Sequence, residues 1–165
     1  MNQNSYKNRF HFVKDTTLRA NLDFALFYIA YLITKEDIET NPKIEQALRK
    51  DVIVHTGSIV EACIHYTMMQ MVQRKIISEE DMFEAEWKIQ EEKPIYSFSD
   101  SKRIRSVLEE KKFPKLTPKT QFKTLNKAAF TCGILNQELY EKAERIREVR
   151  NRIHFMSLAE VDTGY

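Results

Sequence analysis

Hydrophobic residues recur at helical spacing over most of the chain, beginning shortly after the N-terminus. Asp15 is of a residue type that often caps helices, and the pattern after it predicts a first helix that ends near Thr34. From Phe24 onward the apolar residues surround this helix almost completely. A helix that is apolar on all sides belongs in a core, so we expect heavy burial.

Two further helices follow with clear start signals. At Asn41 the side chain can cap a helix while Pro42 takes its first position, and the apolar pattern continues to about Arg74. A third helix is expected from Ser78, because Asp81 three residues later resembles a capping box. It would contribute three large side chains to packing: Met82, Phe83 and Trp87.

The stretch from about residue 94 to residue 118 has no regular period and is interpreted as an irregular insert. Within it, residues 95–99 indicate a short extended piece, and residues 104–112 indicate one or two helical turns. Prolines at both ends of the stretch interrupt any longer element.

The C-terminal part predicts two more helices. Thr117 and Pro118 start a helix that ends at Gly133 as a left-handed cap, and a last helix runs from Glu138 to about Leu158. The pattern as a whole predicts an all-α fold, an up-and-down bundle of four to five helices, in a single domain over residues 1–165.

The amino-acid composition excludes several other fold classes and kinds of site. The chain has 165 residues with three glycines and four prolines, which leaves little material for a many-stranded sandwich or a glycine-rich phosphate loop. No hydrophobic run reaches the roughly 20 residues that span a bilayer. The N-terminus has no apolar core of a signal peptide, and Cys63 and Cys132 lack metal-ligand spacing, so we expect a cytoplasmic protein without a metal site and with no membrane partner.

Charge is unevenly distributed although the formal net charge is only +2. Residues 102–127 hold nine Lys and Arg against two Glu, a balance of +7. Residues 78–92 hold seven acids against one Lys, a balance of −6. The basic segment could follow a phosphate backbone, and a set of solvated helix faces with a mobile loop is an equally good interpretation of the same charges.

The last predicted helix carries a polar stripe beside its apolar one. At 100° per residue, four polar side chains fall on one face: Arg147, Arg150, Asn151 and His154. Histidine can exchange a proton near neutral pH, and arginine can hold phosphate oxygens through two parallel hydrogen bonds. The alternative is that these are ordinary surface charges of a helix.

Residues 149–155, VRNRIHF, resemble the motif of the HEPN superfamily, in which an arginine precedes a histidine with four to six residues between them. Six residues separate Arg147 from His154, whereas Arg150 is followed by a polar residue as in the family but stands only three residues from the histidine. The resemblance leaves open which arginine is the principal one. It implies a HEPN-like helical bundle and a metal-independent endoribonuclease that cleaves single-stranded RNA by attack of the 2′-hydroxyl, without a cofactor.

Residues 58–66 of the second helix are similar to the Ser- and Glu-bearing inner helix of HEPN proteins. Glu61 lies there in an apolar stretch and needs a partner if it is buried, which Arg147, Arg150 or His154 could supply. A solvent-facing Glu61 fits the periodicity as well.

In-line cleavage uses both a base and an acid, whereas the motif supplies one histidine per chain. His65, four residues after Glu61, could approach the site, although a core or surface role is the more common one. Two copies meeting across a two-fold axis would supply two histidines, so we expect a homodimer with a composite site, as HEPN relatives also imply.

RNA is the expected partner, with three lysines as candidates for its backbone: Lys119, Lys123 and Lys127. The resemblance implies a role in bacterial defence or a toxin-antitoxin-like system, with an antitoxin or defence protein as a further partner. The alternative is a HEPN-like module that binds RNA or a nucleotide, or that dimerises, without catalysis. A purely structural bundle is a third interpretation.

Overall fold

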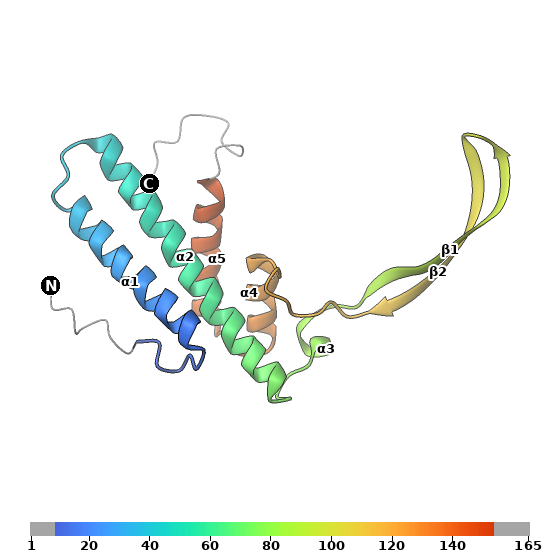
Figure 1. Ribbon diagram of the computed structural model, residues 1–165, viewed down its shortest axis with the longest axis horizontal. Coiled ribbons are helices and arrows are strands. Elements are labelled where there is room, and N and C mark those ends of the chain that lie inside the picture. The colour runs from blue at the N-terminus through green and yellow to red at the C-terminus, as the bar shows by residue number, and fades with distance from the viewer. Residues whose placement is uncertain (1–8, 154–165) are drawn as a thin grey trace.

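The computed structural model describes residues 9–153, and Figure 1 shows a helical body from which a two-stranded ribbon projects. α2 is the longest helix and the centre of the body: α1 packs along one side of it, and α4 and α5 pack against it as well. The described elements are α1 (Thr16–Glu36), α2 (Pro42–Gln73), α3 (Glu79–Met82), β1 (Glu86–Ser99), β2 (Lys102–Lys112), α4 (Phe122–Thr131) and α5 (Gln137–Arg152).

Helix starts follow the capping residues of the sequence. The Asp15 carboxylate accepts a hydrogen bond from the Leu18 amide at 2.8 Å, and Asn41 accepts one from the Lys43 amide at 3.0 Å. Ser78 and Asp81 form the predicted capping box. The first two helices therefore begin where expected, because each cap satisfies amides that the helix itself cannot.

The two C-terminal helices differ from expectation in their bounds. α4 begins at Phe122 instead of Pro118, because Thr117 and Thr120 close a turn first: the Thr117 amide donates to the Thr120 hydroxyl at 3.0 Å. Gly133 has φ +70° after α4, as the left-handed cap requires. α5 is described as far as Arg152, and the predicted extension to Leu158 lies outside the described residues.

The all-α prediction is wrong, because β1 and β2 form an antiparallel hairpin that projects from the helical body. Pairing runs from Glu86 opposite Lys112 to Ser99 opposite Lys102, with three register shifts. The extended piece at residues 95–99 is confirmed, whereas residues 104–112 are strand and not helix. A scarcity of glycine argues against many tight turns, but one hairpin needs a single turn, and residues 100–101 make it without glycine.

The third predicted helix is cut short by the same hairpin. α3 ends at Met82, and Trp87 lies on β1 with 65% of its surface exposed. Its predicted packing role is therefore wrong. Met82 and Phe83 do reach the core, since they precede the ribbon.

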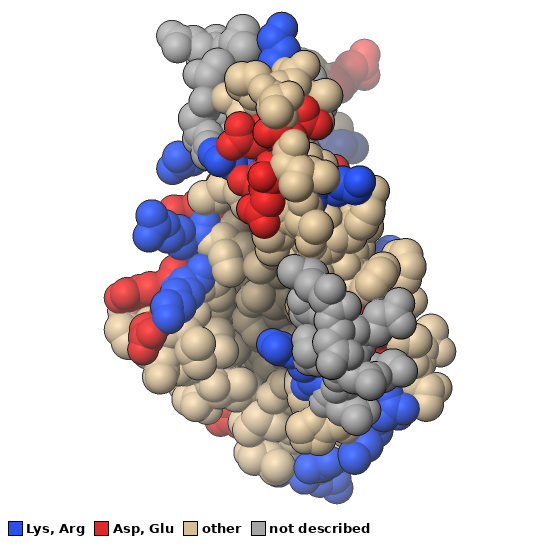
Figure 2. Space-filling model, turned by 90° about the vertical axis from the view of Figure 1, so that its left-hand side faces the viewer, with Lys and Arg blue, Asp and Glu red and all other residues tan. Residues whose placement is uncertain are grey.

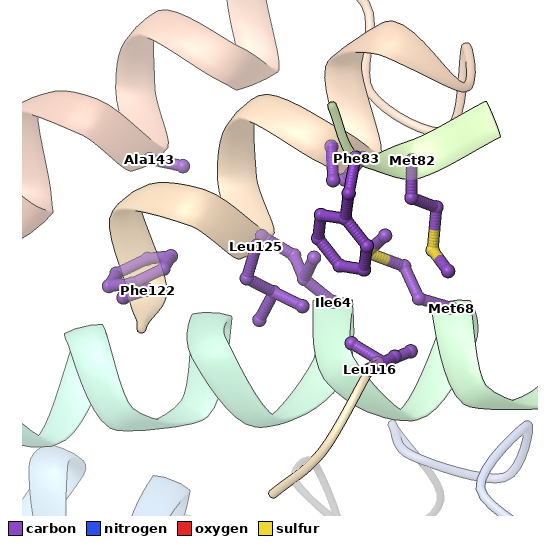
Figure 3. Packing of buried hydrophobic residues seen from close by; sticks show 10 residues of the cluster. Ile64, Met68, Met82, Phe83, Leu116, Phe122, Leu125 and Ala143 are labelled. Carbon is purple, nitrogen blue, oxygen red and sulfur yellow. The ribbon is translucent and has the colours of Figure 1, made fainter. Parts of the chain in front are cut away.

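The main core lies between α2, α4 and the segments around them (Figure 3). Leu125 of α4 and Met68 of α2 are fully buried at its centre. The other large side chains shown in contact around them are Ile64, Met82, Phe83, Leu116 and Phe122, with Ala143 where α5 approaches. This core fixes α4 and α5 on one side of α2.

α1 is less buried than its composition predicts. Leu22, Ile29 and Leu32 face α2, but Phe24 is 71% exposed and Phe27 and Tyr31 are about half exposed. Seen from the end opposite the ribbon, the middle of the surface carries few charged side chains (Figure 2). None of the helices within residues 9–153 is both long and apolar enough to cross a membrane.

Candidate functional site

Gly57 of α2 lies under the side chain of Arg150 from α5. A Cβ atom at this buried position would stand 3.1 Å from Cδ of Arg150 and 3.3 Å from Cγ2 of Ile146. Both distances are tighter than ordinary contacts, so a larger residue would force the side chains of Arg150 and Ile146 to shift. The missing side chain of Gly57 lets the arginine stem cross α2 at close range.

From there the Arg150 guanidinium reaches Glu61, one turn further along α2. Nη1 of Arg150 donates a hydrogen bond to Oε2 of Glu61 at 2.6 Å. Both side chains are about 30% exposed, which places the ion pair at the edge of the core. Of the three partners considered for Glu61, the structure brings Arg150 to it.

Arg147 is held by a second acid, on its own helix. Its Nε and Nη2 donate to Oε2 of Glu144 at 2.9 and 2.7 Å. The other carboxylate oxygen of Glu144 accepts from Nδ2 of Asn126 at 2.7 Å, and the same amide reaches the Tyr140 carbonyl at 3.3 Å. Asn126 is fully buried, so this chain of hydrogen bonds fixes Arg147 from the core outward.

The network shifts the pKa values of both charged groups. Burial raises the pKa of Glu144, but hydrogen bonds from Arg147 and Asn126, with the charges of Arg147 and Lys123, outweigh it and leave the pKa below its usual range. The hydrogen bond with Glu144 raises the pKa of Arg147. The pair is therefore ionised at neutral pH.

A cavity of about 340 Å³ opens where α2, α4 and α5 meet. Five residues that the sequence singled out line it: Glu61, Lys123, Arg147, Arg150 and Asn151. Gln121 and Phe122 complete the wall. The cavity combines three cations and two amides with one carboxylate, a donor-rich setting that suits the oxygens of a phosphate group.

Three contributors to this site were given no site role in the sequence analysis: Gln121, Phe122 and Asn126. Gln121 and Phe122 precede and begin α4, in a stretch (residues 120–127) that resembles the helix before the HEPN motif without indicating a role for either side chain. The role of Asn126 could not be predicted, because one polar residue in an apolar helix gives no indication of its hydrogen-bond partner. Glu144, by contrast, is predictable as a partner of Arg147, because residues three apart meet on a helix, and the structure confirms this contact.

The other predicted residues fall elsewhere. His154 lies outside the described residues. Lys119 is exposed in the turn before α4. Lys127 lines a different and larger cavity of about 440 Å³, where Nζ stands 3.7 Å from Glu84 among several acids.

The basic segment is also divided in space. Its first part forms β2 on the projecting ribbon, where Arg105 pairs with Glu92 of β1, while its last part lies on α4. Of the three lysines proposed for the RNA backbone, Lys123 is the one that the structure brings to the arginines.

Comparison of the chain with protein-family models, curated proteins and solved structures finds no match. Between Arg9 and Ile153, no group of three or more His, Cys, Asp or Glu side chains is placed to hold a metal ion.

Proposed function

We propose that this chain is a metal-independent endoribonuclease that cleaves single-stranded RNA. The observation that carries the proposal is the cavity in which Arg147, Arg150, Lys123 and Asn151 converge from two helices. A phosphodiester in this cavity would meet cationic donors on two sides. Such donors stabilise the charge that builds on the phosphorus oxygens during cleavage.

The reaction follows from the chemistry of RNA. The ribose 2′-oxygen attacks the adjacent phosphorus, the bond to the 5′-oxygen breaks, and the products are a 2′,3′-cyclic phosphate and a 5′-hydroxyl. A base must take the proton of the 2′-hydroxyl and an acid must protonate the leaving oxygen. We assign proton transfer to His154, because this histidine belongs to the HEPN-like sequence motif.

The two carboxylates take the role of positioning the arginines. Glu61 holds Arg150 at the rim of the cavity, and Glu144 holds Arg147 through Nε and Nη2. An arginine fixed in this way loses little conformational freedom when a phosphate arrives.

In this proposal the active form is a homodimer, because a second copy would bring a second His154 to the cleft. Multi-angle light scattering measures the mass directly. A particle of twice 19.6 kDa at micromolar concentration is expected, whereas a monomer that still cleaves RNA would show that one copy suffices.

The biological setting that we propose is bacterial defence or a toxin-antitoxin-like system in the cytoplasm, with a neutralising or defence protein as partner. The free thiols of Cys63 and Cys132 fit a reducing compartment.

The test is cleavage of labelled single-stranded RNA by the full chain in EDTA, with the new 5′-hydroxyl ends detected by polynucleotide kinase. Alanine at Arg147, Arg150 or His154 is expected to lower the rate by about 100-fold or more. Arg145→Ala is the matched control, since Arg145 is an exposed arginine of the same helix, and its rate should stay within about twofold. Cleavage that EDTA abolishes, or that all three variants retain, would contradict the proposal.

The ion pairs themselves favour a second candidate, a non-catalytic module that binds RNA or a nucleotide or that dimerises. Arg147 and Arg150 each face a carboxylate, as arginines with purely structural roles often do. This candidate predicts salt-dependent binding of single-stranded RNA without any cleavage product.

A further inference from the structure

A second cavity of about 280 Å³ adjoins the one that holds the arginines. Glu61 lines both cavities, so the two are neighbours along the same side of α2. The second is an open cavity lined by α2, by α1, by α4 and by the turn before α4. Polar residues of its lining are Ser58, Glu61, His65 and Thr120.

This cavity has an apolar lining with polar groups at defined places. Leu18, Ala62 and Leu125 supply the apolar part, in contrast to the cationic cavity beside it. His65 lies close to the Thr117 carbonyl, with Nε2 at 3.0 Å from its oxygen, so Nε2 carries a proton and holds the turn against α2.

Two hydroxyls in the same lining keep capacity for a ligand. The Thr120 oxygen accepts from the Thr117 amide at 3.0 Å, which leaves its own proton to donate. The Ser58 hydroxyl donates to the Val54 carbonyl at 2.9 Å, which leaves its oxygen able to accept. One donor and one acceptor beside an apolar surface match the edge and the face of a nucleobase or its ribose.

We infer that this second cavity is a nucleoside subsite, which receives the base and ribose next to the phosphate held by Arg147, Arg150 and Lys123. Its size is close to the lower end of ligand pockets, about 300 Å³, and suits one nucleoside and not a longer segment. The inference rests on the proposed function in that it takes RNA as the ligand. In this inference Ser58, Thr120 and the apolar lining bind the substrate and take no part in proton transfer.

Binding to the full chain is measured by calorimetry with three probes: a 2′-O-methylated ApA dinucleotide, which lacks the attacking hydroxyl, ribose 5-phosphate and inorganic phosphate. The wild-type chain should bind the dinucleotide at least about tenfold more tightly than phosphate, because only the dinucleotide fills both cavities. Arg150→Ala should weaken all three probes.

Ser58→Phe is the variant that separates the cavities. Ser58 is exposed at the mouth of the second cavity, so a phenylalanine can block it while the core stays intact. We expect at least a tenfold loss of dinucleotide affinity, about 1.4 kcal/mol, with phosphate binding unchanged. Ala47→Phe, at an exposed position of the same helix, is the matched control and should bind all probes as the wild type does.

Thr120→Val keeps the shape of the side chain and removes its hydroxyl, so it tests the same cavity without added bulk. A loss of about threefold or more in dinucleotide affinity is expected. The inference is overturned if the dinucleotide binds no better than phosphate, or if both Ser58→Phe and Thr120→Val bind it like the wild type. A chain that binds the dinucleotide as described but leaves RNA uncut would refute the endoribonuclease and retain the subsite.

Discussion

Arg150 donates a hydrogen bond to Glu61 at 2.6 Å and thereby joins α5 to α2 across 89 positions of the sequence. The same pair forms part of the wall of the cationic cavity. Its removal should therefore change both helix packing and the binding of anions. The two effects can be separated by measuring unfolding and binding on the same variants.

A double-mutant cycle on Glu61→Gln and Arg150→Gln tests the strength of this ion pair. Because both side chains are about 30% exposed, we expect a coupling energy of about 1 kcal/mol in urea unfolding. The exposed pair of Glu138 and Lys142, at 2.6 Å, is the control and should couple by less than about 0.5 kcal/mol. Equal coupling in the two pairs would show that burial adds nothing at Glu61.

Gly57→Val tests the close approach of α5 to α2. The new side chain would meet Arg150 and Ile146 at distances that the present packing does not allow, so we expect a loss of about 1–3 kcal/mol in the free energy of unfolding. Ala47→Val, on an exposed face of the same helix, should cost only about 0.5 kcal/mol through helix propensity. Equal losses would mean that the helices can separate here without penalty.

Glu144 should make stability depend on pH in the acid range. Its pKa in the folded chain lies below the value of about 4.3 that a free glutamate has, so the ionised form stabilises the fold. That contribution is complete above the unfolded pKa and is lost as pH falls through the folded one. Unfolding free energy should therefore fall less steeply below about pH 4.3 in Glu144→Gln than in the wild type. Parallel curves for the two proteins would contradict this assignment.

The ribbon should be dispensable for the helical body. Every residue of β2 is exposed, and β1 with β2 meets the helices only at its base. A chain in which residues 89–109 are replaced by Asn-Gly keeps Lys88 opposite Glu110 and closes the ribbon with a tight turn. Its free energy of unfolding should stay within about 1 kcal/mol of the wild type by circular dichroism. A larger loss would mean that the ribbon supports the core.

Local signals in the sequence predicted where α1, α2 and α3 begin, but not the length of α3 and not the ribbon. Asp15, Asn41 and Ser78 act on amides a few residues away, so a helix cap can be predicted from the local sequence without knowledge of the rest of the fold. The ribbon depends on pairing between residues up to 26 positions apart, from Glu86 to Lys112, and the side chains that the structure describes on both strands are exposed. No simple alternation marks such strands, because neither face is buried.

In the candidate site too, the local sequence predicted the features within one helix but not the contacts between helices. The helical wheel placed Arg147, Arg150 and Asn151 on one face of α5, and all three line one cavity. The close approach of α5 to α2 at Gly57 decides that Arg150, and not Arg147, reaches Glu61. The role of Asn126 depends on a tertiary contact with Glu144, which no local pattern encodes.

The projecting ribbon also affects how the molecule diffuses. At about 3.3 Å per residue, the 11 residues of β2 reach outward by roughly 35 Å, which gives the particle a much larger Stokes radius than a sphere of 19.6 kDa. A monomer should elute early from a size-exclusion column, near the position of a compact dimer. The chain with the shortened ribbon should elute later by more than its lower mass requires.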